Sequence, residues 1–179
     1  MALTVLLLGL PACNRRSPSP GGGGQIDMRW TGSGGGRLSG PATAEWCAIH
    51  RLLEIRSIRG DTGIALALYP ADSLTSGRYR VRRPAQAESL RPAAGLALRW
   101  AAQTSIKGFQ GESGSVLLER TGSEALSGRL VATARSVADT GRLQVSGTFT
   151  ELALRPASRG CTRPPSDTLD APAVDTLVH

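Results

Sequence analysis

Hydrophobic and polar residues alternate along most of the chain from residue 25 onward. Alternation with a period of two residues is typical of a strand with one face in a core and one in solvent. Helical periodicity never persists for more than about ten residues, so the sequence predicts an all-β domain. The apolar residues expected to lie on one side of each predicted strand include Ile26, Met28 and Trp30; Leu38, Ala42, Ala44 and Trp46; Ile64, Leu66 and Leu68; Leu96, Leu98 and Trp100; and Leu143, Val145 and Phe149.

Turn sequences separate these runs, notably TGSGGG (31–36) and RGDTG (59–63). The spacing predicts about eight or nine antiparallel strands, arranged as a β-sandwich or as an up-and-down barrel. The alternation changes phase between Cys47 and Leu53 and again near Thr150, which predicts a corner or bulge at each place. Residues 83–95 contain two prolines and are expected to form a surface connection.

The N-terminal 24 residues do not follow this pattern. An apolar run from Ala2 to Leu10 is too short to span a bilayer, which needs about 20 residues. A short apolar run followed by small residues is typical of an export signal. Residues 14–24 (NRRSPSPGGGG) contain no large apolar side chain and predict a flexible tether.

The sequence Leu10-Pro11-Ala12-Cys13 resembles the lipobox of bacterial lipoproteins. The resemblance implies that residues 1–12 are removed as a signal segment and that Cys13 carries fatty acyl chains such as palmitate. It implies a bacterial envelope protein, with Asn14 favouring the outer membrane over the inner one. The alternative is an ordinary cysteine after a chance apolar run. The expected organisation is a signal segment at 1–12, a lipidated tether at 13–24, a β-domain at 25–161 and a disordered tail at 162–179.

Two further cysteines, Cys47 and Cys161, lie early and late in the predicted β-domain. Exported proteins occupy an oxidising space in which paired thiols tend to form disulfides. We expect these two cysteines to form a disulfide if Cys13 is lipidated, with two buried thiols as the alternative.

The chain carries a net charge of +7, and all but one of its 21 basic residues are arginine. The arginines are scattered, with no basic helix and no aromatic strand of the kind that binds RNA, so nucleic acid is not an expected partner. Arg78, Arg80 and Arg82 alternate with apolar residues and predict a basic stripe on one strand face. This stripe is either a solvated sheet edge or a contact with anionic lipid, polysaccharide or an acidic protein partner.

No catalytic or metal-binding constellation emerges from the sequence. The only histidines are His50 and His179, no CxxC or HxxxH spacing occurs, and the acidic residues do not cluster, so no set of three or four zinc ligands can be assembled and no cofactor is expected. GESGS (111–115) approaches the nucleophile elbow GxSxG but ends in serine and precedes no helix. Each tryptophan lies on the same side of its predicted strand as neighbouring apolar residues, which predicts that it packs in the core. We expect a non-catalytic binding or structural module, with a small hydrolase or a calycin-like barrel holding an apolar ligand as alternatives.

Overall fold

A computed structural model describes residues 24–122 and 124–157, and it confirms the all-β class. The expected signal segment, Cys13, most of the expected tether, Cys161 and the expected C-terminal tail lie outside these residues. Within the described part, no helix is long and apolar enough to cross a membrane. The elements are β1 (Gln25–Gly32), β2 (Gly36–Pro41), β3 (Thr43–Cys47), β4 (Leu52–Arg59), β5 (Thr62–Tyr69), β6 (Gly77–Val81), α1 (Pro84–Ala87), β7 (Ala93–Ala102), β8 (Ser105–Thr121), β9 (Ala125–Ser136) and β10 (Arg142–Pro156).

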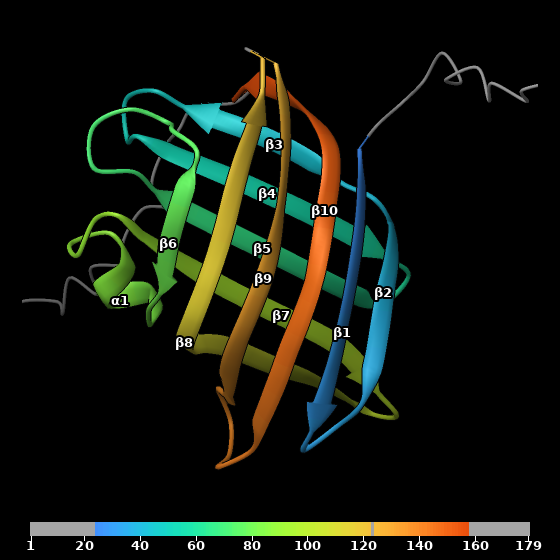
Figure 1. Cartoon of the computed structure of the whole chain (residues 1–179). Coiled ribbons are helices and arrows are strands. Elements are labelled where there is room, and N and C mark those ends of the chain that lie inside the picture. Colours follow the sequence, from blue (N-terminus) through green and yellow to red (C-terminus); the bar gives the residue numbers. More distant parts are fainter. Residues whose placement is uncertain (1–23, 123, 158–179) are drawn as a thin grey trace, which may run out of the picture.

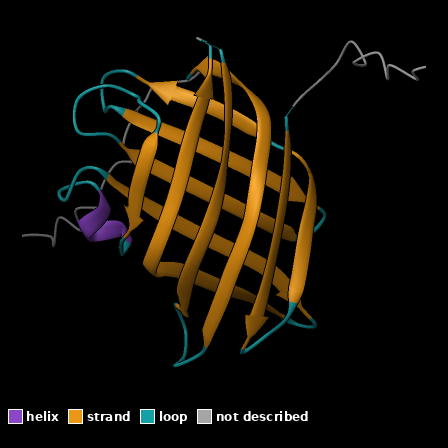
Figure 2. Cartoon of the chain, in the orientation of Figure 1, coloured by secondary structure: helices purple, strands orange, loops and turns teal. Residues whose placement is uncertain are grey.

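The ten described strands form two layers whose strands run across one another (Figure 1, Figure 2). The front layer contains β6, the second half of β8, β9, β10, β1 and β2, and the back layer contains β3, β4, β5, β7 and the first half of β8. Pairing of β9 with β10, in addition to the linear strand order, closes the sheet on itself. The result is a flattened, closed sheet with one core between its layers.

Two long strands pass from one layer to the other. Strand β8 pairs with β7 as far as Gln110 and with β6 from Ser115, and its register shifts between Gly111 and Ser113. Strand β10 pairs with β1 as far as Thr150 and with β3 from Leu154, and its register shifts between Phe149 and Leu152. Bulges of this kind bend a strand at the corner of a crossed-layer fold. The phase change near Thr150 is therefore a bulge, as its alternation predicts.

The alternating side chains meet between the layers. Met28 and Phe149 of the front layer and Leu66 and Leu96 of the back layer are at most 1% exposed. The close approach of β1 and β10 depends on Gly147, which lies opposite Met28. A Cβ atom at Gly147 would come within 2.6 Å of the Met28 Sδ and would overlap the Asp27 carbonyl oxygen. The core thus requires a glycine at this strand position.

The fold departs from a simple antiparallel meander in two ways. The apolar run from Leu38 to Trp46 divides into β2 and β3 at Ala42, because the chain leaves the front layer for the back layer there. Pro41 has no N–H for a ladder, and the Ala42 N–H donates to the Gly24 carbonyl instead (2.9 Å). In addition, β6 runs parallel to β7 and β10 runs parallel to β3. Part of the expected connection at 83–95 is helix α1, and the rest leads into β7.

Candidate functional site

The predicted arginine stripe lies on β6 and just beyond its end. Arg78 and Arg80 are exposed, Arg82 is half-buried, and the intervening Tyr79 and Val81 are each 2% exposed. The Tyr79 hydroxyl donates to the Thr75 carbonyl at 2.9 Å, which fixes the inward face of this short strand. Strand alternation therefore directs Arg78 and Arg80 out of the front layer, as the pattern predicts, whereas Arg82 lies beyond the end of β6 and is not placed by it.

The stripe is one edge of a larger polar surface, the outer face of the front layer. Residues directly opposite one another on paired strands project from the same face of a sheet. One rung across the layer contains Arg80, Ser115, Val131, Ser146, Arg29 and Arg37. The next rung contains Arg78, Leu117, Arg129, Thr148, Asp27 and Ser39.

These two rungs carry five arginines and one carboxylate. The carboxylate, Asp27, is held by Arg37, whose Nε and Nη2 donate to Oδ1 at 2.9 Å and to Oδ2 at 2.5 Å. This hydrogen-bonded guanidinium lowers the pKa of Asp27. The other four arginines, Arg29, Arg78, Arg80 and Arg129, form no ion pair with any residue of the described ranges. The outer face of the front layer is therefore a basic, hydroxyl-rich surface.

A separate charged cluster lies at the bulge of β8. The Glu112 carboxylate accepts a hydrogen bond from Arg83 (Nη2 to Oε1, 2.8 Å) and lies 3.6 Å from the Arg142 Nε. The hydrogen bond from Arg83, together with the positive charges of Arg142 and Arg135, lowers the pKa of Glu112. The cluster joins the chain after β6 to β8 and β10. Nothing in the local sequence around Glu112 predicts it, because its partners come from distant strands.

The described residues bring no catalytic constellation together. Among them, no group of three His, Cys, Asp or Glu side chains could hold a metal ion. His50 lies in the turn after β3, where its carbonyl oxygen accepts a hydrogen bond from the Arg91 Nη2 at 3.0 Å. Ser113 lies within β8, opposite Thr133, rather than on a strand-to-helix turn. The GESGS segment is consequently a strand bulge and not a nucleophile elbow.

The tryptophans pack in or against the core, as predicted. Trp30 is 4% exposed, and Trp46 and Trp100 are partly buried against the core cluster. Trp100 stacks between Trp30 and Phe109, with ring centroids 5.5 Å and 5.1 Å away respectively. The Trp30 Nε1 is buried and has no hydrogen-bond partner within the described part of the chain. An exposed aromatic platform for sugars is thus not formed by these rings.

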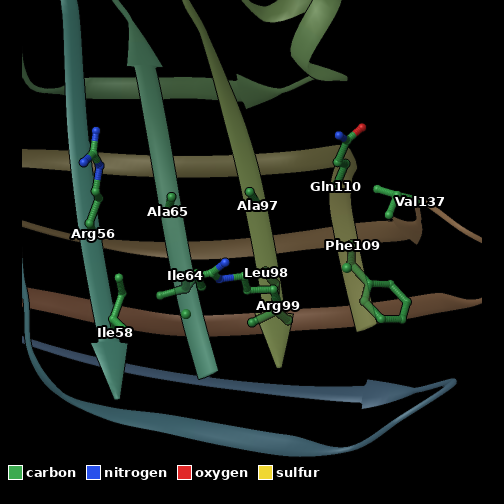
Figure 3. Close-up of a pocket in the computed structure, with 12 residues that line it drawn as sticks. Arg56, Ile58, Ile64, Ala65, Ala97, Leu98, Arg99, Phe109, Gln110 and Val137 are labelled. Atoms are coloured by element: carbon green, nitrogen blue, oxygen red, sulfur yellow. The ribbon is translucent and has the colours of Figure 1, made fainter. Parts of the chain in front are cut away.

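An apolar groove lies on the outside of the back layer (Figure 3). It has a volume of about 320 Å³ and crosses β4, β5, β7 and the first half of β8. Ile58 and Val137 stand at its two ends, 66% and 59% exposed. Gly63, Ala65, Ala97 and Gly108 lie among the lining residues between them, and the Arg99 side chain extends from β7 over Gly63. No sequence signal predicts this groove, because its lining residues come from four strands and from Val137, which follows β9.

Cys47 lies on the outward-facing side of β3, whereas Ala44 and Trp46 lie on its inward-facing side. The Cys47 residue is nevertheless only 5% exposed. It does not belong to the core cluster that contains Ala44. Where β10 ends, the Ala157 N–H donates to the Trp46 carbonyl at 3.0 Å, so the chain that leads to Cys161 departs beside Cys47.

The fold and these surfaces define a β-domain of two crossed layers with a basic face and an apolar groove on opposite layers. No family model, no curated protein and no solved structure matches the chain.

Proposed function

We propose that the protein is a bacterial envelope lipoprotein whose β-domain rests on anionic lipid headgroups through the outer face of its front layer. The observation that carries this proposal is the set of four arginines there without an ion pair in the described ranges: Arg29, Arg78, Arg80 and Arg129. Each basic residue near an anionic membrane surface contributes about 1 kcal/mol of attraction. Serine and threonine hydroxyls between the arginines supply hydrogen bonds to phosphate oxygens.

The anchor in this proposal is Cys13, acylated after removal of residues 1–12. Acyl chains contribute about 0.8 kcal/mol for each buried CH₂, and stable attachment needs two signals, which a multiply acylated cysteine supplies. A flexible tether over residues 13–24 would hold the domain at a root-mean-square distance of roughly 20 Å from its anchor. Asn14 favours the outer membrane.

A disulfide between Cys47 and Cys161 belongs to the same proposal. Its support is the burial of an outward-facing Cys47 and the path of the chain beside it at Ala157. Such a bond would tie the end of the domain to β3 in an oxidising compartment.

Binding to vesicles tests the basic face. The full chain with Cys13→Ser, which cannot be acylated, is sedimented with vesicles of neutral lipid or of neutral lipid mixed with phosphatidylglycerol. We expect binding only to the anionic vesicles and a steep decrease with salt. R78Q/R129Q should weaken binding about 10–30-fold, since two cations at about 1 kcal/mol each are lost.

R59Q/R155Q is the matched control, because it removes the same charge from exposed positions outside the front layer. Equal losses in the two double variants would show attraction by net charge alone and overturn the proposed face. The anchor has its own test: intact-mass measurement of the mature protein should find acyl groups on Cys13, and processing should be sensitive to globomycin. A mature soluble protein that retains residues 1–12 would contradict it.

The alternatives from the sequence receive less support. A hydrolase requires a nucleophile or paired acids beside a cleft, and His50 and Ser113 are structural elements of a turn and a bulge. A calycin-like carrier requires an apolar interior that is open to a ligand. Side chains that are almost completely buried, including Met28, Leu66 and Phe149, occupy the space between the layers.

A further inference from the structure

The apolar groove on the back layer lacks a partner among the described residues. We infer that it is occupied by the C-terminal segment of the same chain, residues 164–179 (PPSDTLDAPAVDTLVH). The inference is independent of the proposed function, since neither the anchor nor the basic face enters it.

The groove has the shape and polarity of a site for an extended apolar chain. Ala65 and Ala97 face each other across β5 and β7, and in the next rung Gly63 faces Arg99. Small side chains leave the sheet backbone accessible to a segment that lies across it. Ile58 and Val137 stand above this floor at its two ends and are mostly exposed in the described structure, so both ends offer apolar surface that a partner segment would cover.

The charge of the groove complements the charge of the segment. Arg99 forms no ion pair within the described ranges, whereas the neighbouring Arg56 is paired with Glu54. The C-terminal segment contains Asp167, Asp170 and Asp175 and no lysine or arginine, although the whole chain carries +7. Leu169, Val174 and Leu177 lie among these aspartates, so the segment offers both apolar side chains and carboxylates.

The path of the chain permits this contact. Ala157 is hydrogen-bonded to Trp46 of β3, and β4, β5 and β7 follow β3 in order across the back layer. Neighbouring strands are about 4.8 Å apart, so the groove centre lies roughly 20 Å from Ala157. Leu169 is twelve positions after Ala157, and an extended chain of that length spans up to about 40 Å.

A second copy of the protein fits the groove less well. A two-fold contact through this surface would place the Arg99 side chains of both copies near one another. Like charges brought together without a counter-charge oppose association. The acidic segment of the same chain supplies that counter-charge, and its covalent attachment raises its effective concentration at the groove.

Methyl NMR spectroscopy tests the inference on the full chain with Cys13→Ser. Its spectrum is compared with that of the same chain ending at Thr162. We expect the Ile58 and Val137 methyl resonances to differ between the two chains. The methyl resonances of Ile49 and Ile106, which are 85% and 71% exposed outside the groove lining, should not differ. A synthetic peptide of residues 164–179 added to the shortened chain should restore the Ile58 and Val137 positions in a saturable manner.

Charge variants of the full chain separate docking from a general effect of truncation. D170K/D175K and Arg99→Gln should each move the Ile58 and Val137 resonances toward those of the shortened chain. Asp72→Lys, at an exposed loop position, should leave them unchanged. Identical Ile58 and Val137 resonances in the full and shortened chains would overturn the inference. Ile58 and Val137 resonances that depend on protein concentration in the full chain would also overturn it, by assigning the groove to a second copy.

Discussion

Arg135 of β9 lies directly opposite Arg142 of β10 in the antiparallel ladder. Like charges at directly opposed positions destabilise a sheet. The Glu112 carboxylate offsets the repulsion, since it lies 3.6 Å from the Arg142 Nε and the positive charge of Arg135 contributes to lowering its pKa. The bulge in β8 thus places a counter-charge beside two arginines that the register of β9 and β10 brings together.

Glu112→Gln should therefore lower the melting temperature, and the loss should be largest at low ionic strength, where charges are least screened. The pKa of Glu112 is lowered in the folded protein. The stabilisation is consequently present above the ordinary carboxyl pKa and disappears as the pH falls through the lowered one. Thermal unfolding at low and high ionic strength measures the first effect, and a pH series from neutral into the acid range measures the second.

Glu119→Gln is the matched control for this prediction, because Glu119 is an exposed residue of β8 that forms no ion pair in the described ranges. Equal destabilisation by the two variants, or a difference between Glu112→Gln and wild type that persists at the lowest pH, would contradict the assignment to the arginine cluster.

Gly147→Ala should destabilise the domain by about 1–3 kcal/mol, the usual cost of overpacking a core. The added Cβ would approach the Met28 Sδ and overlap the Asp27 carbonyl oxygen. Urea unfolding measures the loss. At Gly35 the nearest atom to an added Cβ is 3.9 Å away, so Gly35→Ala should have little effect. Similar stabilities for the two variants would show that β1 and β10 approach less closely than described.

The parallel rings of Trp100 and Phe109, 5.1 Å apart, should contribute to stability beyond their buried area. A double-mutant cycle with Trp100→Leu and Phe109→Leu should give a coupling energy of about 0.5–1.5 kcal/mol. Near-ultraviolet circular dichroism should lose intensity in either single variant. A coupling energy of zero would mean that the two rings stabilise the domain separately.

Cys47→Ser tests the proposed disulfide through stability. A bond that closes a loop of about 100 residues stabilises by roughly 4.7 kcal/mol in the chain-entropy model. We expect a loss of this order in oxidising buffer and a similar loss when the Cys13→Ser chain is reduced. The Cys13→Ser chain, denatured without reductant, should contain no free thiol. Two free thiols under those conditions would contradict the pairing of Cys47 with Cys161.

Much of the fold follows from local pattern. The alternation of Ile64, Leu66 and Leu68 places β5, and the phase change near Thr150 places the bulge of β10. The alternation does not predict the break between β2 and β3 at Ala42, because the chain passes from the front layer to the back layer there while its apolar residues stay at even-numbered positions. The parallel pairing of β6 with β7 is also absent from the sequence pattern, because it depends on the path of the chain through α1.

The candidate surfaces are less accessible to sequence reasoning. Alternation alone places Arg78 and Arg80 on an outer strand face. Their association with Arg129 and Arg29 depends on which strands become neighbours, and those strands are separated by long stretches of sequence. The same holds for the apolar groove between Ile58 and Val137.

The sequence by itself determined the strand class and the inward or outward direction of side chains in the strands whose residues alternate, because both follow from a two-residue period within a single strand. Only the tertiary structure decided which outward side chains share a surface. Pairing between distant strands depends on their register and on the bulges of β8 and β10, and these result from packing of the whole core. Four scattered arginines became one basic face, and small residues of separate strands became one groove, for that reason.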